Sequence, residues 1–550
     1  MLKSRRVSRF DSNLTNISWR PDSILENSDM LRDPNLRIAV SVHIFYEDFL
    51  FKLIPLLENL PCEFDLLVTT SSESIRNSLL KRLESLSIQN LKKTEIAISK
   101  NVGRNFGPLL VEYSKKLLVE YDVFLHLHSK KSVHSGVEQT AWADYLYHNL
   151  IGSKAVTRKI IEEFVSDSTI GMVFPTTVPG MPSWVHSWGK NHSGAVALAS
   201  EMNLKSPNQG FHIYPVGGMF WCRTSAIKPI LAREWTYNVF PEELGQTDGT
   251  IQHALERFYT HVSDLSGFKS IFIHEQKLTS DKSFAWRDQD LGAFHKLQNY
   301  LPQCQIVSWD FFDTLIQRTY GFTELAKHRV GETLASQNLI SDPEQYVIVR
   351  NSVEARMRDT LPQGKDLNLL SITREIVSFL SLNIKPEVLA KLEFEEDLKT
   401  FKPRTDIELL YRAHHKRSII VSDSFYNEIE IRLSLQALNL PEPLFIITSS
   451  DIGRRKDRAD IWPYLISRFQ LDKIRFIHIG DNVVSDNQNP GDYKLSTFFT
   501  PTSFEIAKML APNLSLEIEP SNKSSEFKPD ILEKAKLIQD VFSSPFIGVS

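Results

Sequence analysis

Two aspartates, Asp310 and Asp313, follow directly on a hydrophobic run within the segment Val307–Ile316, which reads VSWDFFDTLI. A short apolar run of this kind predicts a buried strand, so both carboxylates would stand just past the end of that strand. Burying a carboxylate is costly unless it is paired with a cation or bound to a metal ion. The residue types and their spacing therefore indicate a functional site in which the negative charge of these carboxylates has a role.

Three later segments supply groups that would complete such a site. Ser422 ends one apolar run, Lys456 lies in a basic stretch, and Asp481 and Asp486 follow the apolar run FIHIG. Each element also has an ordinary alternative. An Asp-x-x-Asp-Thr sequence is common at a helix N-terminus or a turn, Lys456 would suit a solvated surface, and GDN is a turn signal. Four elements in this order, three of them directly behind predicted strands, favour one shared site.

The order Asp-x-x-Asp, Ser, Lys and GDxxxxD resembles the four motifs of the haloacid-dehalogenase-like (HAD) phosphohydrolases, over roughly residues 303–515. The resemblance implies that Asp310 is a nucleophile that forms an aspartyl-phosphate, and that Asp313 is the general acid and base. It also implies that the Ser422 hydroxyl binds a phosphoryl oxygen, and that Lys456 neutralises charge growing on the phosphoryl group.

The same resemblance implies a Mg²⁺ ion, which prefers a few carboxylates together with water and phosphate oxygens. Asp310 and Asp481 would hold it together with a backbone carbonyl near residue 312, and either Asp486 or Asn482 would support the metal shell. We therefore predict a metal site built by Asp310, Asp481 and Asp486. A largely helical, charged stretch at about 321–404 is interpreted as a cap that determines the substrate.

The N-terminal half carries a second group of polar and aromatic residues. It lies in five segments, which are Val42–Glu47, Asn101–Pro108, Leu125–His134, Pro215–Arg223 and Phe240–Arg257. Together these segments are similar to the rhamnan synthesis protein F family of bacterial polysaccharide assembly, over roughly residues 35–275. The resemblance implies that rhamnose or a related sugar is transferred from a nucleotide-sugar donor to a glycan or lipid-linked glycan acceptor.

Sugar transfer from a nucleotide donor expels a diphosphate, which calls for positive charge at the carboxyl ends of the strands. Arg104 lies in a glycine-rich loop, and Lys130 and Lys131 follow a predicted strand, so all three can face the leaving group. Inverting transfer also needs a carboxylate that takes the proton of the acceptor hydroxyl. The candidates for this base are Asp248, Glu242 and Glu243.

Two histidines, His126 and His128, stand where metal-dependent glycosyltransferases of the single-Rossmann type usually carry Asp-x-Asp. Because side chains alternate along a strand, both histidines would share one face of it. They would either ligate a metal, or pack and hydrogen-bond within the protein. We predict metal-independent transfer, with lysines in the place of the metal and His128 as a substrate-binding residue.

Aromatic residues of this half could stack on a sugar or a base, and Trp221 is the leading candidate. The other candidates are Trp184, Trp188 and Phe220. The GGMFW run that contains Trp221 would equally suit a buried strand, although its glycine pair allows close approach of the backbone to a ligand. Asp248, which precedes Gly-Thr and a predicted helix, has the alternative of an ordinary helix N-cap.

Strand and helix patterns alternate in both halves, which predicts an α/β protein with two doubly wound parallel-sheet domains. The first would be glycosyltransferase-A-like, and the second a HAD-like Rossmannoid with a helical cap. Strands of the first half are predicted at Leu36–Tyr46, Phe64–Thr70, Thr94–Ser99, Tyr121–Leu127 and Ile170–Pro175. In chain order we expect an irregular tail (1–35), the first domain (36–276), a polar linker (277–303), the second domain (304–515) and a C-terminal extension (516–550).

The composition of the 550 residues is that of a soluble globular protein with two or more domains, at 42% hydrophobic and 24% charged. A net charge of −4 gives no electrostatic case for nucleic acid as a partner. The three cysteines are far apart and fit a reducing, cytoplasmic setting. The start, MLKSRRVSRF, is basic without the apolar run of a signal peptide, so we expect at most peripheral contact with the inner face of the membrane.

Together these features predict a cytoplasmic two-domain enzyme of bacterial cell-surface polysaccharide synthesis, of the rhamnan or O-antigen type. It would join a glycosyltransferase-like module to a Mg²⁺-dependent module that hydrolyses a phosphorylated small molecule. Two alternatives stay open, namely a sugar-phosphate phosphatase whose N-terminal half only binds glycan or nucleotide, and a non-catalytic assembly scaffold. The intact Asp310, Asp313, Lys456 and Asp481 count against the scaffold, whereas the missing Asp-x-Asp keeps the phosphatase alternative.

Overall fold

The chain divides into two compact units, Met1–Gln289 and Asp290–Ser550, and the division falls inside the predicted linker 277–303. This computed structural model describes residues 35–86, 88–130, 140–178, 181, 183–243, 248–274, 277–279, 293–362, 364–511, 514 and 527–546. The predicted tail, apart from its last residue, and Lys131 lie outside the described residues.

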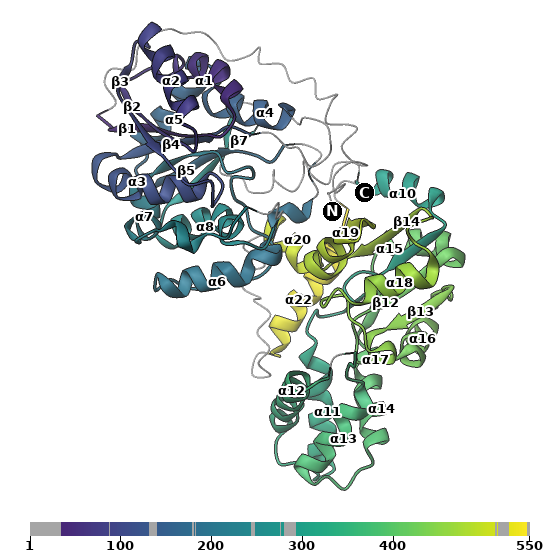
Figure 1. Ribbon diagram of the computed structural model, residues 1–550. Helices are drawn as coiled ribbons and strands as arrows, with labels where there is room; N and C mark the ends of the chain where they lie inside the picture. Colours follow the sequence, from purple (N-terminus) through teal and green to yellow (C-terminus); the bar gives the residue numbers. More distant parts are fainter. Residues whose placement is uncertain are drawn as a thin grey trace. The chain divides into compact units, whose positions relative to one another are not determined.

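An eight-stranded sheet in the order β3-β2-β1-β4-β6-β5-β7-β8 is the basis of the first unit (Figure 1). The strands are β1 (Ile38–Ile44), β2 (Phe64–Thr70), β3 (Leu91–Ile98), β4 (Val123–His128), β5 (Ile170–Pro175), β6 (Phe220–Arg223), β7 (Lys269–His274) and β8 (Lys277–Thr279). β1 to β4 are parallel, as are β5 and β7, but β6 is antiparallel to both of its neighbours and β8 is antiparallel to β7. The sheet is therefore mixed, where we predicted a parallel one.

Helices cover both faces of this sheet, because its strands are apolar on both faces. They are α1 (Leu50–Leu57), α2 (Glu73–Ser85), α3 (Phe106–Glu120), α4 (Thr140–Ile151), α5 (Lys154–Ser166), α6 (His192–Glu201), α7 (Lys228–Ala232) and α8 (Ile251–Leu265). In β4, Leu125 and Leu127 pack with α1, α2, α4 and α5, whereas Phe124 packs with α3, α6, α7 and α8. With both faces covered, polar side chains gather at the carboxyl ends of β1 to β4.

The second unit contains a five-stranded parallel sheet in the order β13-β12-β9-β14-β15. Its strands are β9 (Ile306–Trp309), β12 (Ser418–Ser422), β13 (Phe445–Thr448), β14 (Phe476–Gly480) and β15 (Ser496–Phe499). Its helices are α10 (Ala293–Tyr300), α15 (Ile407–His414), α16 (Glu428–Ala437), α17 (Ser449–Ile452), α18 (Ile461–Phe469), α19 (Asn489–Asp492), α20 (Ser503–Leu510) and α22 (Pro529–Val541). Because β9 is central, the residues that follow it meet those that follow β12 and β14.

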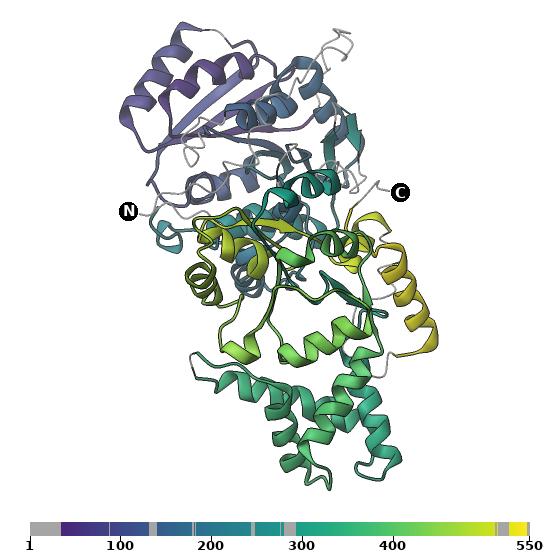
Figure 2. The same ribbon diagram turned by 90° about the vertical axis from the view of Figure 1, so that its right-hand side faces the viewer.

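A helical insert interrupts this unit between β10 (Ile316–Arg318) and β11 (Phe401–Pro403), an antiparallel pair. It consists of α11 (Glu324–Ser336), α12 (Pro343–Asp359), α13 (Leu369–Leu380) and α14 (Pro386–Leu398), which lie together as a group of helices (Figure 2). These helices have an apolar core of their own. The insert occupies the stretch in which we predicted a cap. At its base Arg318 donates to both carboxylate oxygens of Asp397, at 2.8 and 2.7 Å, and the Tyr426 hydroxyl donates to the same carboxylate.

Candidate active site

The carboxyl edge of the central strands brings the acidic residues of the second unit together. Asp310 follows β9, Ser422 ends β12, and Asp481 follows β14. Trp309 pairs with Ile420 of β12 and with Ile479 of β14, so the three strands end at nearly the same level. Ligands of open parallel sheets bind at this edge.

Lys456 reaches this group from the loop between α17 and α18, although it does not follow directly on a strand. Its ammonium nitrogen lies 2.6 Å from an oxygen of Asp310 and 2.6 Å from an oxygen of Asp486. Its side chain is 2% exposed, and that of Asp486 is fully buried. The alternative of a solvated surface lysine is therefore wrong, and one cation bridges two buried carboxylates.

Asp486 is held from several sides. His478 lies in β14 with Nε2 3.0 Å from the Asp486 oxygen that Lys456 contacts, and with Nδ1 2.7 Å from the Ser308 hydroxyl. The backbone N–H of Asn482 donates to the other oxygen of Asp486 at 2.9 Å. Gly480 makes the approach possible, because a Cβ there would lie 2.3 Å from the Asp486 carboxyl carbon.

A cation would fit between the aspartates. Carboxylate oxygens of Asp310, Asp481 and Asp486 all lie within 4.8 Å of one another, and hard oxygen donors of this kind suit Mg²⁺. Both oxygens of Asp486 are engaged by protein groups, so Asp310 and Asp481 are the residues that would contact the ion. Asn482 instead caps the π-helical turn Val483–Gln488, with its side-chain oxygen accepting from two backbone N–H groups.

Electrostatics distinguish the three carboxyls. Burial raises the pKa of Asp310 to about 7, against the opposing charge of Lys456. Burial, together with the charges of the neighbouring aspartates, raises the pKa of Asp481 well above its ordinary value. Burial also acts to raise the pKa of Asp486, but Lys456 and His478 outweigh it and hold that pKa at about 2. A bound cation would relieve the repulsion between Asp310 and Asp481.

Asp313 is held in an unusual backbone conformation, with φ at +54°. The fully buried Arg404 supports it by donating to the Asp313 carbonyl oxygen at 2.6 Å, and also donates to the carbonyls of Pro501 and Ser543. Burial raises the pKa of the Asp313 carboxyl, with Arg318 and Arg404 opposing. A carboxyl that keeps its proton more readily is suited to general acid catalysis.

The first unit also gathers polar groups at its carboxyl edge. Glu243 accepts from the backbone N–H of Arg104 at 3.1 Å and from the Gln252 amide at 3.2 Å. Lys130 lies with its ammonium 3.7 Å from the centre of the Trp142 ring, and burial lowers its pKa to about 8. Two of the predicted donor-site cations are therefore placed at the ends of β3 and β4.

The two histidines of β4 are engaged within the protein. Nε2 of His128 lies 2.8 Å from the Gly217 carbonyl oxygen, and Nε2 of His126 lies 3.1 Å from the Asn105 amide nitrogen. Burial lowers the pKa of His128 to about 3 and that of His126 well below its ordinary value, so both rings are neutral at pH 7. Hydrogen bonding and packing thus account for both residues.

The structure corrects one prediction for the first unit and excludes one alternative. Trp221 is fully buried within β6, where its indole N–H donates to the Leu150 carbonyl, so it has no face for a substrate. Asp248 is not a helix cap, because Thr250 is the N-cap of α8. The Asp248 carboxylate instead accepts from the Asn191 amide at 2.5 Å, and its role as a base stays a prediction. The other two aromatic candidates with buried side chains are Trp188 and Phe220.

Sequence reasoning missed His253 and Glu256 in the first unit. Glu256 accepts from the backbone N–H of Gly217 at 2.8 Å. His253 lies 2.7 Å from the Thr250 hydroxyl, and burial together with the charge of Arg104 lowers its pKa to about 3. Spacing of three residues in the motif DGTIQHALER puts Thr250, His253 and Glu256 on one side of a helix, and that signal could have found them.

The described fold and site define an α/β protein with a carboxylate–lysine centre at the edge of a parallel sheet. Residues 7–267 match the model of a family described as Rhamnan synthesis protein F, and this description points to polysaccharide synthesis. Two curated relatives, both described as uncharacterized protein WxcX from strains of Xanthomonas campestris pv. campestris, are 26% identical over 220 residues. The match covers 40% of this chain and 30% of the length of those relatives.

Solved structures similar to this chain include a protein described as the HAD-hydrolase YfnB from Bacillus subtilis bound to magnesium, with a TM-score of 0.28 and 14% identity. The alignment covers 42% of this chain and 99% of YfnB. Another is a 2-haloacid dehalogenase from Pseudomonas syringae pv. Tomato DC3000, with a TM-score of 0.27 and 13% identity over 35% of this chain and 85% of that one. A HAD phosphatase from Thermococcus onnurineus has a TM-score of 0.25 and 16% identity, covering 38% of this chain and 97% of its own.

Among the described residues, no helix has both the length and the apolar character needed to cross a membrane.

Proposed function

We propose that the second unit is a Mg²⁺-dependent phosphohydrolase that uses Asp310 as its nucleophile. The observation that carries the proposal is the bridge formed by Lys456 between Asp310 and Asp486, with an oxygen of Asp481 within 4.8 Å of both carboxylates. Burying an isolated carboxylate would only destabilise the fold, whereas this arrangement suits an anionic substrate and a divalent cation.

In the first step an Asp310 oxygen attacks phosphorus, the bond between phosphorus and the ester oxygen breaks, and Asp313 gives its proton to the departing oxygen. In the second step Asp313 takes a proton from water, which attacks the aspartyl-phosphate, releases inorganic phosphate and restores Asp310. The Ser422 hydroxyl and the Lys456 ammonium hold phosphoryl oxygens through both steps. Mg²⁺ held by Asp310 and Asp481 would supply further positive charge at the phosphoryl group.

The experiment compares wild type with Asp310→Asn on a generic aryl phosphate in the presence of Mg²⁺. The carboxamide keeps the shape but is a poor nucleophile, so we expect hydrolysis to fall by on the order of 10³-fold or more. The exposed Asp472 offers a matched control, because Asp472→Asn removes a carboxylate of the same unit that is not one of the site residues. A wild-type protein that hydrolyses no phosphoester in a broad screen contradicts the proposal.

A second candidate function, sugar transfer by the first unit, is favoured by the family match at residues 7–267. We propose that Arg104 and Lys130 bind the diphosphate of a nucleotide-sugar donor, and that Asp248 accepts the proton of the acceptor hydroxyl. The acceptor would be a glycan or a lipid-linked glycan, at the cytoplasmic face of the membrane. Incubation with a panel of nucleotide-sugars, with release of nucleotide as the readout, tests the activity.

Binding of a nucleoside diphosphate tests the donor site separately. Lys130→Ala and Arg104→Ala should each weaken it by about 1.5–3 kcal/mol, the value of a charge-assisted hydrogen bond. Hydrolysis by the second unit should not change, and chelator should leave nucleotide binding intact. Binding that is lost in chelator and restored by Mn²⁺ would instead make His126 and His128 metal ligands. Nucleotide binding without sugar transfer would favour a phosphatase whose first unit only binds nucleotide. A wild-type protein with neither sugar transfer nor phosphoester hydrolysis would favour a scaffold.

A further inference from the structure

The loop that carries Lys456 is in contact with the helical insert. Between α12 and α13 the insert forms a loop that reaches the segment Gly453–Arg458 of the core. The Arg458 guanidinium donates to the Lys365 carbonyl oxygen at 3.1 Å. Gly453 has a φ of +69° and lies so close to Gly364 that a Cβ on Gly453 would be 2.1 Å from the Gly364 oxygen. The two loops therefore meet backbone to backbone.

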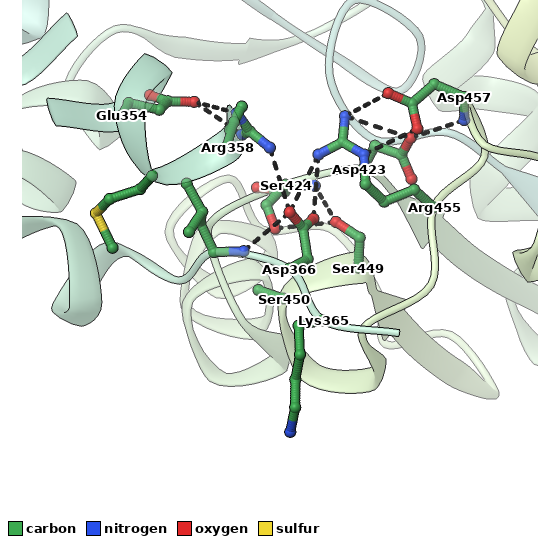
Figure 3. A network of polar contacts seen from close by, with 12 residues as sticks. Glu354, Arg358, Lys365, Asp366, Asp423, Ser424, Ser449, Ser450, Arg455 and Asp457 are labelled. Carbon is green, nitrogen blue, oxygen red and sulfur yellow. Dashed lines mark hydrogen bonds and ion pairs between the residues drawn. The ribbon is translucent and has the colours of Figure 1, made fainter. Parts of the chain in front are cut away.

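Asp366 supplies the charge at this junction, as Figure 3 shows. Its side chain is 1% exposed, and its carboxylate lies between two guanidinium groups. Arg455 of the core contacts both carboxylate oxygens at 3.2 Å, and Arg358 of α12 contacts one of them at 3.2 Å. Breaking a buried pair leaves an uncompensated charge, so the contact strongly favours the docked position of the insert.

Arg455 connects this junction to the backbone next to Lys456. Its guanidinium also binds both oxygens of Asp457, at 2.8 and 2.7 Å (Figure 3). Arg455 and Asp457 flank Lys456 directly in sequence. A displacement of Arg455 would therefore be passed to the residue that bridges Asp310 and Asp486.

Asp423 fixes the same segment from the core side. It follows Ser422 at the end of β12, and its two carboxylate oxygens accept from the backbone N–H groups of Lys456 and Asp457, at 2.8 and 3.1 Å. The Asn489 amide adds a bond to the Lys456 carbonyl at 2.8 Å. The backbone of Lys456 is thus clamped by the core, and its neighbour Arg455 is clamped by the insert.

We propose that Asp366 is a positioning residue that couples docking of the helical insert to the placement of Lys456. With the insert docked, Asp366 holds Arg455 and the segment presents the Lys456 ammonium to Asp310. With the insert displaced, only contacts within the core, among them those of Asp423 and Asn489, anchor the segment, and the ammonium is less strictly placed. The catalytic consequence rests on the proposed phosphohydrolase function, whereas the mechanical coupling does not.

Hydrogen exchange followed by mass spectrometry on the full chain tests the mechanical coupling. In Asp366→Asn, the peptide that contains the amides of Lys456 and Asp457 should exchange about tenfold faster, because a charge-assisted contact that holds the segment is weakened. Asp359→Asn, an exposed residue at the end of α12, is the matched control and should exchange as wild type does. Unchanged exchange in Asp366→Asn overturns the proposal, whether or not the protein hydrolyses phosphate.

Steady-state hydrolysis of an aryl phosphate tests the catalytic consequence. Asp366→Asn should lower kcat about tenfold with little change in KM, and Asp366→Glu, which keeps the charge, should recover part of the loss. Arg455→Lys should cause a similar loss, and the double variant Asp366→Asn/Arg455→Lys should lose no more than either single variant. If the fold losses in kcat of the two single variants multiply in the double variant, Asp366 and Arg455 act independently, which contradicts the proposed coupling.

Discussion

Replacing Asp310 should stabilise the second unit, because holding this buried carboxylate ionised without a bound cation costs free energy. Burial raises the pKa of Asp310 from an ordinary value of 3.8 to about 7. The unfolded chain therefore loses this proton at lower pH than the folded chain does. The contribution of Asp310 to the unfolding free energy is fully present below pH 3.8. It is lost as the pH rises toward 7, since the carboxyl ionises more easily in the unfolded state.

The magnitude follows from the same two pKa values. The full difference between the two pKa values corresponds to a free-energy cost of about 4 kcal/mol for ionising Asp310 in the folded protein. About 1.5–2 kcal/mol of this cost is present at pH 5, and nearly all of it at pH 8. Asp310→Asn removes this cost while its amide oxygen still accepts a hydrogen bond from Lys456. We therefore expect the variant to exceed wild type in unfolding free energy, and by about 2 kcal/mol more at pH 8 than at pH 5.

Scanning calorimetry of the full chain with chelator measures this, because we expect each unit, with its own sheet and core, to give its own transition. Asp472→Asn serves as the control and should shift neither transition by more than about 0.5 kcal/mol. Adding Mg²⁺ should raise the wild-type transition of the second unit and leave the Asp310→Asn transition nearly unchanged, since the variant lacks one of the two proposed Mg²⁺ ligands. A variant that is no more stable than wild type at pH 8 in chelator would refute the assigned cost of burial.

Three further predictions follow from the fold. Fragments 1–289 and 290–550 should each melt cooperatively, since each unit has its own sheet and core; molten behaviour of both would contradict this. Burial lowers the pKa of His43 to about 4, so the unfolding free energy should fall by up to about 3 kcal/mol as the pH falls from 6.5 to 4. His43→Gln should reduce this loss, which urea denaturation at pH 7 and pH 4.5 measures. Arg404→Ala should lower the unfolding free energy by about 3 kcal/mol or more and reduce aryl phosphate hydrolysis, because three carbonyls lose their donor and Asp313 loses its support; near-normal activity would argue against that positioning role.

The parts of the site that follow strands could be predicted from the sequence. Asp310, Ser422 and Asp481 each stand directly behind a short apolar run, and the carboxyl ends of parallel strands meet at one edge. The place of Lys456 in the site could be predicted only as part of a motif, since nothing in its basic neighbourhood distinguishes a buried lysine from a solvated one. Its pairing with Asp486 was not predicted. Burial depends on which loop folds over the sheet, and that is a property of the whole unit.

Other contacts could not be read from local patterns. Arg404 contacts carbonyls up to 139 residues away in sequence, and the residue gives no sign that it is buried. Trp221 was misread because an aromatic residue beside glycines suits a ligand platform and a core strand equally well. The direction of β6 was also not readable, because a strand that is apolar on both faces has the same pattern in a parallel and an antiparallel position.

The base of the helical insert has a consequence for how the second unit folds. β9 must pair with β12 across roughly 110 residues of chain, and non-local pairing of this kind is slow because the chain between must first be brought together. The contacts of α11 to α14 are nearer in sequence, and the pairing of Arg318 with Phe401 joins the two ends of the insert. An insert that forms early thus shortens the effective loop to roughly 25 residues and lowers its closure entropy by about 1 kcal/mol. The helical insert would then also speed assembly of the sheet into which it is inserted.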